Sequence, residues 1–438
     1  MTIWKRCGTV MTSMKKLTAD VIVIGGGAAG MFSAIHAARR GLRVLLLEKN
    51  AGCGKKLLIT GKGRCNVTNA CTPEEVLKNV PRNGRFLYSS VFAFPPERTM
   101  QFFETYGCPL KTERGKRVFP VSDRSADVLA ALTRAMKQAG VQHRQGTAER
   151  LLLDNGRICG VGDGTQSLSC GAVILCTGGV SYPLTGSTGD GYRMAAALGH
   201  TILPPVGSLV PLVCDGGDCS EMQGLSLRNT ALRLLDAKGK TVYSDFGELL
   251  FTHFGLSGPM ALSASAHMKA GERYRVLLDL KPALEDAALD TRFLRDFEKY
   301  SNRSMENALS DLYPHSMIPV ILRRTGIDPL MRANVLMKAQ RRALLEETKR
   351  FCISVRGTRP VEEAIVTRGG VEVRQIDPRT MQSRLVPGLF FAGEIIDCDA
   401  YTGGFNLQIA WSTAHAAAEG CAALLQQEKN CVARPAGD

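Results

Sequence analysis

A glycine-rich turn near the amino end limits the possible folds of this chain more than any other feature. The stretch "DVIVIGGGAAGMFSAIHAARRGLRVLLLE", residues 20–48, carries the spacing G-x-G-x-x-G at Gly25, Gly27 and Gly30. A continuous apolar run precedes the turn, good helix formers follow it, and a second apolar run ends at Glu48. The order strand, turn, helix, strand predicts a β-α-β unit that binds a dinucleotide, with the terminal acid accepting hydrogen bonds from a ribose.

Each glycine of the turn has its own expected task. Gly25 would make the tight turn, Gly27 would admit a pyrophosphate, and Gly30 would let the helix approach the strand. The helix start at Ala28 and Ala29 would then direct backbone N–H groups at the phosphates.

The carboxyl end carries a second strand, glycine pair and helix, in "GLFFAGE" and "GGFNLQIAWSTAHAAA". Gly403 and Gly404 would allow a close approach to the backbone, and the helix start at Asn406 would present amides and a positive dipole end. That end suits the electron-rich edge of a reduced flavin, and Glu394 could hold a ribityl hydroxyl. A dinucleotide held by both chain ends points to FAD rather than NAD.

The pattern predicts an α/β fold, with a Rossmann-like FAD-binding domain made from both chain ends. An antiparallel β unit and a helical subdomain are inserted into it. We expect a flexible amino-terminal lead at 1–19, the FAD-binding domain at 20–200 and 352–438, the β substrate domain at 201–284, and a basic helical subdomain at 285–351.

Composition excludes several classes of protein. The chain has 438 residues, 45% hydrophobic and 22% charged, and no apolar run reaches the ~18 residues that a membrane span needs. The amino end lacks the apolar core of a secretory signal, so we expect a cytoplasmic protein without membrane association. The 14 cysteines include no C-x-x-C pair, so no metal site is expected.

The net charge of +14 is concentrated in one segment. Residues 321–360 hold ten Lys/Arg against three acids. The segment could be a solvated helix face or a surface for a polyanion such as RNA. An aromatic content of 6% gives no obvious platform for base stacking.

The stretch "GKKLLITGKGRCNVTN", residues 54–69, gathers positive charges around glycines and a single cysteine. Gly61 and Gly63 disfavour a helix there, which suggests a loop that holds a negatively charged group. Cys65 has no neighbouring base or resolving cysteine, so its two possible roles, reactive thiol and packed spectator, both stay open.

Six stretches together resemble one family. They are "DVIVIGGGAAGMFSAIHAA", "GKKLLITGKGRCNVTN", "VILCTGGVSYPLTGSTGDGY", "LLFTHFGLSGPMAL", "TRGGV" and "TMQSRLVPGLFFAGEIIDCDAYTGGFNLQIAWSTA". The chain resembles the FAD-dependent oxidoreductases called NAD(FAD)-utilising dehydrogenases, BaiN/YhiN-like flavoproteins or aminoacetone oxidase family enzymes. The resemblance implies that the stretch 54–69 wraps the flavin, with Phe405 standing where the family often has Tyr.

The resemblance and the motifs together give the expected cofactor-binding set. Its members are Gly25, Gly27, Ala28, Ala29, Gly30, Glu48, Lys49, Lys56, Thr60, Gly61, Gly63, Arg64, Cys65, Asn66, Thr177, Gly178, Gly393, Glu394, Gly403, Gly404 and Asn406.

The family's activities imply three kinds of reaction. Some members reduce steroid-like enones of the 3-dehydro-bile-acid type, some convert uridine in ribosomal RNA to dihydrouridine, and a third group is named for aminoacetone oxidation. The first two share hydride transfer from flavin N5 to a C=C bond conjugated with a carbonyl, and we expect that reaction, with a small molecule or ribosomal RNA as substrate. An amine oxidase and a non-catalytic FAD-binding protein remain alternatives. Since no second G-x-G-x-x-G exists, NAD(P)H is expected as a transient reductant.

Candidate proton donors come from separate parts of the chain. The stretch "FTHFGLSGP" contains His253 and is a candidate wall of the substrate pocket. Tyr401, with Asp397 and Asp399 beside it, flanks the expected flavin edge, and Cys65 completes the set. The sequence does not choose between them, and it leaves the oligomeric state open.

Overall fold

The computed structural model describes residues 19–164 and 166–432, and the chain divides into two compact units. The first unit combines the two chain ends, running to Gly207 and resuming at Ile365, and the second is Ser208–Ala364. The expected Rossmann-like core, built from both ends around an insertion, is therefore present.

A five-stranded parallel sheet forms the centre of the first unit, in the order β19-β10-β1-β2-β6. Its strands are β1 (Val21–Ile24), β2 (Val44–Glu48), β6 (Gln142–Gln145), β10 (Ala172–Leu175) and β19 (Leu389–Phe391). All residues of β1, β2, β10 and β19 are buried, as expected of parallel strands covered on both faces. The chain leaves β1 for β2 on one side, whereas β10 lies on the other, so the strand order reverses at β1.

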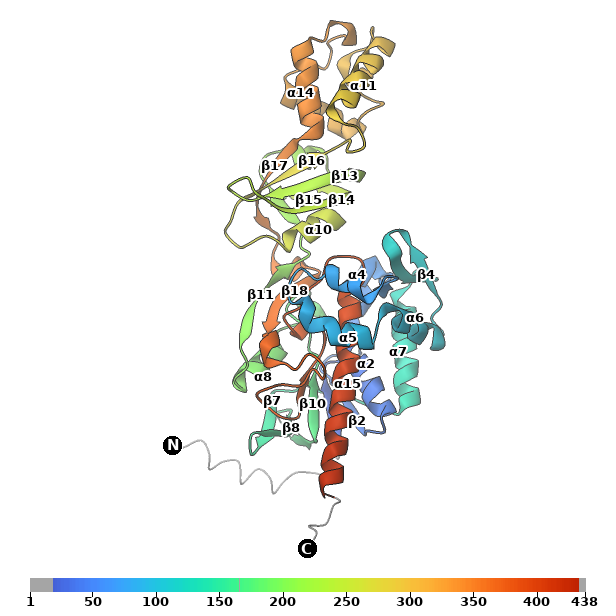
Figure 1. The fold of residues 1–438 in the computed structure, drawn as a ribbon, viewed down its shortest axis with the longest axis vertical. Helices are drawn as coiled ribbons and strands as arrows, with labels where there is room; N and C mark the ends of the chain where they lie inside the picture. Colours follow the sequence, from blue (N-terminus) through green and yellow to red (C-terminus); the bar gives the residue numbers. More distant parts are fainter. Residues whose placement is uncertain (1–18, 165, 433–438) are drawn as a thin grey trace. The chain divides into compact units, whose positions relative to one another are not determined.

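Two long helices pack side by side against this sheet (Figure 1). Helix α2 (Ala28–Arg39) contacts β1, β2 and β10, and α15 (Phe405–Val432) contacts α2, β10 and β19. Helix α7 (Ser125–Ala139) packs against α2. The amino-terminal and carboxyl-terminal segments thus share one hydrophobic core.

Shorter elements surround the sheet and the long helices. They are α3 (Lys55–Ile59), β3 (Thr68–Asn69), α4 (Pro73–Lys78), α5 (Tyr88–Ala93), α6 (Pro96–Thr105), β4 (Leu110–Glu113), β5 (Arg117–Pro120), β7 (Arg150–Asp154), β8 (Arg157–Gly162), β9 (Ser167–Ser169), α8 (Asp190–Ala197), β11 (Ile202–Ser208) and β18 (Val366–Val371).

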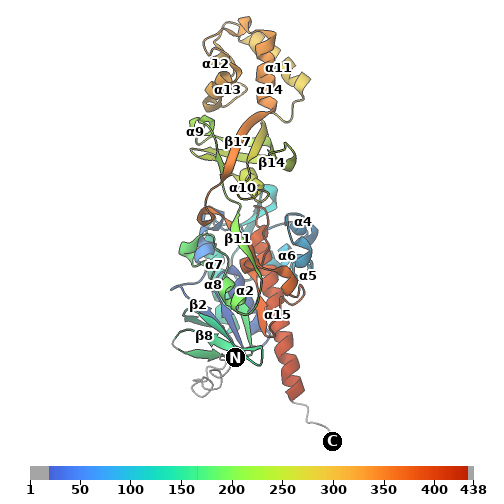
Figure 2. The ribbon, with the colours of Figure 1, turned by 90° about the vertical axis from the view of Figure 1, so that its left-hand side faces the viewer.

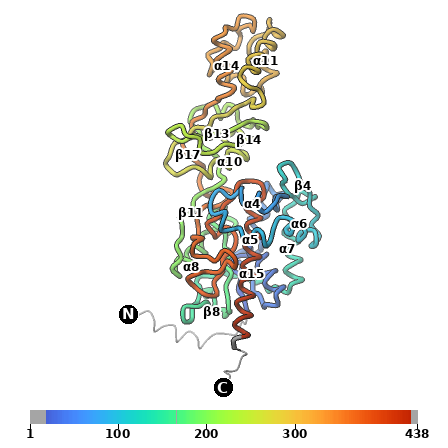
Figure 3. The backbone as a smooth tube through the Cα atoms, in the orientation of Figure 1, coloured from blue at the N-terminus to red at the C-terminus, as the bar shows by residue number. Residues whose placement is uncertain are grey.

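The second unit is a closed antiparallel barrel, with α11 and α14 at one end of it and α10 at the other (Figures 2 and 3). Its strands are β12 (Leu212–Cys214), β13 (Ser226–Leu235), β14 (Thr241–Thr252), β15 (Gly255–Ser257), β16 (Tyr274–Asp279) and β17 (Phe351–Thr358). Its helices are α9 (Asp218–Glu221), α10 (Pro259–Ser265), α11 (Asp286–Lys299), α12 (Met305–Ala308), α13 (Ile318–Thr325) and α14 (Lys338–Lys349). One hydrophobic core runs from the barrel into these helices, so they fold together.

The structure corrects two of the expected boundaries. The sequence predicts a return to the FAD-binding domain at 352, but β17 pairs with β12 and β16 and closes the barrel. Likewise β11, expected in the insertion, pairs with β18 and belongs largely to the first unit. Alternating polar and apolar residues show that a segment is a strand, but they do not show which strand it pairs with. Both boundaries of the insertion were therefore misplaced.

Candidate functional site

Four strand ends of the first unit meet at one edge of the parallel sheet. The glycine turn follows β1, Glu48 ends β2, Thr177 lies two residues after β10, and Gly393 lies two residues after β19. Because the strands are parallel, these segments share the carboxyl edge beside the reversal of strand order at β1, the place where open α/β sheets bind ligands in a crevice.

The three motif glycines differ in what surrounds them. A Cβ on Gly25 would lie 2.5 Å from the Cys176 carbonyl oxygen, and one on Gly30 would lie 1.7 Å from the Gly25 carbonyl oxygen. A Cβ on Gly27 would meet nothing within 4 Å. The protein's own packing therefore requires glycine at two of these positions, whereas Gly27 faces open space.

The amino end of α2 receives no side-chain cap from the described residues. Gly27 is the N-cap, no side chain caps the helix, and its first turn, which begins Ala28-Ala29, holds no acid. Nearby, the buried Glu48 accepts from the Gly26 N–H at 2.6 Å and from the Asn50 backbone N–H at 2.7 Å. A helix start free of carboxylates, with an acid fixed beside it, suits a phosphate next to a ribose.

The end of β19 lies against the first turn of α2. Gly393 has φ of 78°, and a Cβ there would lie 2.7 Å from the Ala29 Cβ. Its N–H donates to the Thr413 hydroxyl of α15 at 3.0 Å. The two chain ends therefore join at the carboxyl edge of the sheet.

The stretch 60–69 is held by the start of α15. A Cβ on Gly404 would lie 2.3 Å from the Thr68 carbonyl oxygen, and the Asn69 side-chain amide donates to the Gly403 carbonyl at 3.0 Å. The Trp411 indole N–H donates to the Val67 carbonyl at 2.9 Å. Two motifs more than 300 residues apart in the sequence are therefore in direct contact.

The backbone of this loop is left-handed at several positions. Gly61, Lys62 and Gly63 have φ of 56°, 57° and 81°, and Cys65 has φ of 59°. Positive φ at Lys and Cys is uncommon and marks local strain. Thr60 supports the turn by donating to the Leu57 carbonyl at 2.7 Å.

Lys56 and Glu394, both in the expected cofactor-binding set, form an ion pair at 2.7 Å. Lys56 also donates to the Ser181 hydroxyl at 2.7 Å, and the Thr367 N–H donates to Glu394 Oε1 at 2.8 Å. Burial disfavours the charged carboxylate, but Lys56, the Thr367 N–H and the Ser181 hydroxyl outweigh it and keep the pKa of Glu394 below its usual range.

Ser181 and Thr367 are not among the residues expected from the sequence. They lie in the quoted stretches "VILCTGGVSYPLTGSTGDGY" and "TRGGV", but no spacing rule links them to Lys56 or Glu394. Only the fold brings these four segments together.

Two other expected cofactor-binding residues have carboxylate partners of their own. Lys49 donates to the Thr188 hydroxyl at 2.6 Å and forms an ion pair with Asp190 at 2.5 Å. Arg64 pairs with Glu113 and Asp123. Their charges are therefore balanced within the protein.

Two buried polar atoms of the expected set lack a hydrogen-bond partner in the described part of the chain. They are Asn66 Oδ1 and Thr177 Oγ1. Gly178, next to Thr177, has φ of 72°, which glycine adopts without strain. Orphaned polar atoms in a folded protein call for an explanation, and a bound polar ligand provides one.

The three candidate proton donors lie in different surroundings. Cys65 is fully buried, and burial raises the pKa of its thiol to about 12, which speaks against a reactive thiolate. His253 is exposed at the turn between β14 and β15 of the second unit. Tyr401 is half-buried in the first unit, and its N–H donates to the Asn79 carbonyl at 3.0 Å.

The turn that carries Tyr401 is firmly held. Asn406 accepts from the Ala400 N–H at 2.9 Å and donates to the Ala400 carbonyl at 2.8 Å. Asp399 accepts from Arg82 at 2.8 Å, and Asp397 accepts from the Gly369 N–H at 3.0 Å. Asn406 therefore orders this turn, and both acids have partners.

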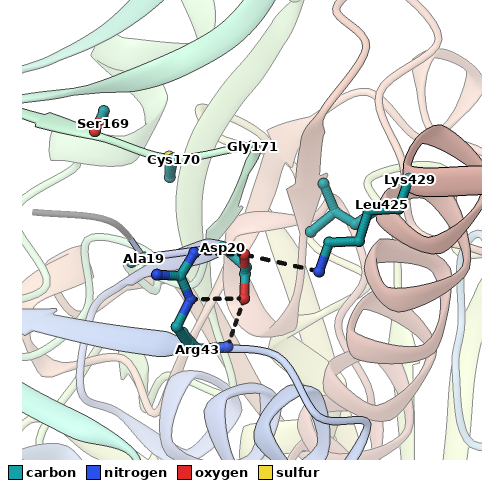
Figure 4. A pocket seen from close by; sticks show the side chains of 8 residues that line it. All are labelled: Ala19, Asp20, Arg43, Ser169, Cys170, Gly171, Leu425 and Lys429. Atoms are coloured by element: carbon teal, nitrogen blue, oxygen red, sulfur yellow. Dashed lines mark hydrogen bonds and ion pairs between the residues drawn. The ribbon is translucent and has the colours of Figure 1, made fainter. Parts of the chain in front are cut away.

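A shallow pocket of about 290 Å3 lies at the other edge of the sheet (Figure 4). Asp20 and Arg43, which pair at 3.0 Å, immediately precede β1 and β2, and Gly171 precedes β10. The pocket is therefore at the amino ends of the strands, away from the crevice.

The described residues include no helix long and apolar enough to cross a membrane. Over the same stretches, no three His, Cys, Asp or Glu side chains are grouped so as to hold a metal ion.

Comparison with known proteins identifies the family. Residues 19–420 match the family described as HI0933-like protein Rossmann domain. The chain belongs to this family. Members of the HI0933-like family are FAD-dependent oxidoreductases, so the resemblance stated from the motifs is confirmed at that level.

Named relatives span almost the whole chain. The 3-dehydro-bile acid delta(4,6)-reductase of Clostridium scindens is 31% identical, covering 91% of this chain and 98% of the relative. The ribosomal RNA dihydrouridine synthase of Escherichia coli is 30% identical, covering 91% of this chain and 97% of the relative.

A solved structure shares the fold. The 3-ketosteroid delta1-dehydrogenase of Sterolibacterium denitrificans, in complex with 1,4-androstadiene-3,17-dione, aligns with a TM-score of 0.52 at 15% identity. The alignment covers 93% of this chain and 99% of that chain. At this identity the likeness concerns the fold alone.

Proposed function

We propose that the protein is a reductase that adds a hydride and a proton across a C=C bond conjugated with a carbonyl group. The observation that carries this proposal is the pair of nearly full-length relatives, named as a bile-acid delta(4,6)-reductase and a dihydrouridine synthase. Both names describe saturation of a C=C bond in a ring, and uridine and 3-keto steroid rings both conjugate that bond with a carbonyl.

The residues at the carboxyl edge fit FAD. The pyrophosphate would lie at Gly27 and the uncapped start of α2, and the adenosine ribose at Glu48. The loop 60–69 and the start of α15 would flank the flavin. The support is the open space at Gly27 and the orphaned polar atoms of the expected set. When bound, FAD supplies the hydride, and we propose NAD(P)H as the reductant that restores it.

The second hydrogen arrives as a proton at the α carbon, and we propose Tyr401 as its donor. Tyr401 lies in the first unit, on a turn fixed by Asn406. Cys65 is disfavoured because its buried thiol has a raised pKa and its side chain is inaccessible to a substrate. Tyr401→Phe should slow flavin reoxidation by the acceptor without lowering flavin content.

Anaerobic titration of the chemically reduced holoprotein tests the proposal. Ribosomal RNA that lacks dihydrouridine and a conjugated steroid ketone are added separately, and the return of flavin absorbance is followed. Reoxidation by either acceptor supports the proposed reaction and identifies the acceptor class.

Reoxidation by neither acceptor, together with anaerobic reduction of the oxidised flavin by an aminoketone, would replace the proposal with an amine oxidase. Anaerobic bleaching by NADPH or NADH tests the reductant. A flavin that responds to no reductant or acceptor would make the protein a non-catalytic FAD-binding protein.

A further inference from the structure

We propose that Arg85, Tyr88 and Phe92, here called the α5 platform, bind single-stranded RNA by stacking its bases and pairing with its phosphates. The inference rests on the proposed function, since it names RNA as the acceptor class that the first unit recognises. It also supplies the stacking surface that composition alone did not reveal.

The two rings of the platform stack on each other at the surface. Tyr88 is 56% exposed and Phe92 36% exposed, and their ring centroids are 4.3 Å apart with 25° between the planes. Two adjacent flat rings open to solvent present a π-face to any base, whatever its identity.

The exposure of the rings follows from how α5 packs. Leu87 and Val91, also four residues apart, are fully buried, and α5 contacts α15. Tyr88 and Phe92 each follow one of these buried residues, so they occupy a neighbouring face of the helix that the first unit does not cover. The core of this unit is therefore complete without the two rings.

The surroundings of the rings are basic. Residues 78–98 contain four Lys/Arg against one acid, and within the described residues only Arg82 of the four forms an ion pair, with Asp399. Arg85 precedes Tyr88 by one helical turn, is exposed, and forms no ion pair within the described stretches. An exposed guanidinium one helical turn before the stacked rings suits a phosphate that joins stacked nucleotides.

The segment that leads into the platform, residues 79–83, contacts the turn 397–401 of the proposed cofactor site directly. Arg82 pairs with Asp399, the Asn83 amide donates to the Asp397 carboxylate at 2.9 Å, and the Tyr401 N–H donates to the Asn79 carbonyl. The segment that carries the rings is thus bonded to the turn that carries the proposed proton donor. RNA held on α5 and the chemistry of the site belong to one unit.

RNA fits these features better than a small ketone does. Small apolar ligands favour concave pockets that bury most of their surface. The α5 platform instead offers two exposed rings and an available cation, which is the combination found where single-stranded nucleic acid binds.

The test is binding of a short fluorescent oligouridine to the FAD-loaded protein, followed by anisotropy at several salt concentrations. The double variant Tyr88→Ala, Phe92→Ala should weaken binding roughly 5- to 150-fold, as loss of one stacked base does. The matched control is Phe246→Ala, which removes a ring that is 56% exposed in the second unit and should leave the affinity unchanged. Arg85→Glu should weaken binding most at low salt and reduce its salt dependence.

A second variant reports stacking directly. Phe92→Trp keeps a flat ring, and the fluorescence of the introduced indole should be quenched when the oligouridine binds. Equal affinity in the double variant and the wild type, absence of RNA binding by the wild type, or unquenched indole fluorescence in Phe92→Trp under saturating RNA would each overturn the platform.

The experiments distinguish a failure of the proposed reduction from a failure of the α5 platform. If binding depends on the rings but reduced flavin is not reoxidised by RNA or by the enone, the proposed reduction fails while the platform stands. If the double variant loses thermal stability but not RNA affinity, the rings serve as a packing surface and the platform is refuted.

Discussion

At the scale of single residues, the ion pair of Lys56 and Glu394 is a half-buried contact between two residues of the expected cofactor-binding set. Each side chain is 21% exposed, so water screens the pair only in part. Ser181 and Thr367 satisfy the remaining donors and acceptors, which is what keeps a charged pair favourable in such surroundings. The pair joins α3 to the segment after β19 at the carboxyl edge of the sheet.

Glu394→Gln should lower the free energy of unfolding by about 1–3 kcal/mol, because it leaves Lys56 without its counter-charge. Since the pKa of Glu394 lies below its ordinary value of 4.5, this contribution is complete above that pH and is lost as the pH falls through the lowered pKa. The difference in stability between the variant and the wild type should therefore shrink on acidification, as measured by denaturant unfolding at a series of pH values.

Glu363→Gln is the matched control. Glu363 also forms an ion pair, with Arg359, but both side chains lie at the surface. It should change stability little at any pH. A stability difference for Glu394→Gln that persists unchanged far into acid would show that the carboxylate charge is not what stabilises the crevice.

The motif glycines allow packing and ligand binding to be separated. Gly30→Ala should destabilise the protein itself, since its Cβ would lie 1.7 Å from a backbone oxygen. Gly27→Ala should keep the thermal stability of the apoprotein but weaken FAD binding roughly 5- to 150-fold, the cost of crowding a close contact. FAD titration and melting of both apoproteins distinguish the two effects, and an unaltered FAD affinity in Gly27→Ala would remove the pyrophosphate from this turn.

At the scale of elements, the sequence predicted those parts whose signals are local. The strand, turn and helix around Gly25 were expected within residues 20–48, with the helix starting at Ala28, and the structure has β1 at Val21–Ile24 and α2 at Ala28–Arg39. A run of apolar residues and a glycine turn act within a few residues, so they can be read from the chain directly.

Features that depend on tertiary pairing were not predictable in this way. Strand β17 looked like a return to the first unit, because its residues alternate like any edge or barrel strand. The stack of Tyr88 on Phe92 was hidden by a low overall aromatic content, since composition does not record which rings are exposed. In the site, Ser181 and Thr367 reach Glu394 only through folding.

The loop 60–69 is attached to α15 by the fully buried Gln408. Its side-chain oxygen accepts from the Thr68 and Thr99 hydroxyls at 2.6 and 2.9 Å, and its amide donates to the Phe94 carbonyl at 2.9 Å. Gln408→Leu keeps a similar volume but leaves the Thr68 and Thr99 hydroxyls without their acceptor, whereas the Phe94 carbonyl still accepts from the Ser412 hydroxyl at 2.8 Å. The free energy of unfolding should fall by about 2–4 kcal/mol, since each unpaired buried polar group costs about 1–3 kcal/mol.

The same change should loosen the loop locally, so trypsin should cleave after the exposed Lys62 sooner than in the wild type. Gln101→Leu, at an exposed position of α6, is the control and should alter neither measurement. If Gln408→Leu melts earlier without faster cleavage at Lys62, the loop is held by contacts other than this one.

At the scale of the whole molecule, the net charge of +14 overstates how many charges of the basic segment 321–360 are available to bind a polyanion. Of its ten Lys/Arg, six form ion pairs, namely Arg323, Arg324, Arg341, Lys349, Arg350 and Arg359. The other four have no ion-pair partner in the part of the chain that the structure describes. Much of the segment's charge therefore stabilises the second unit.

Two adjacent arginines of α14 allow stabilisation of the second unit and binding of a polyanion to be tested separately. Arg341 pairs with Asp290 of α11 at 2.7 Å and its side chain is 17% exposed, whereas Arg342 is exposed. Arg341→Glu should therefore lower the melting temperature, because it places two carboxylates together at a helix contact, and Arg342→Glu should not. If RNA also touches this segment, Arg342→Glu should reduce the slope of log affinity against log salt by roughly 0.7, the contribution of one phosphate contact on a single strand. Equal melting temperatures of the two variants would mean that the ion pair with Asp290 contributes nothing to stability. An unchanged salt slope in Arg342→Glu would mean that any RNA bound by the protein contacts other surfaces, the α5 platform foremost among them.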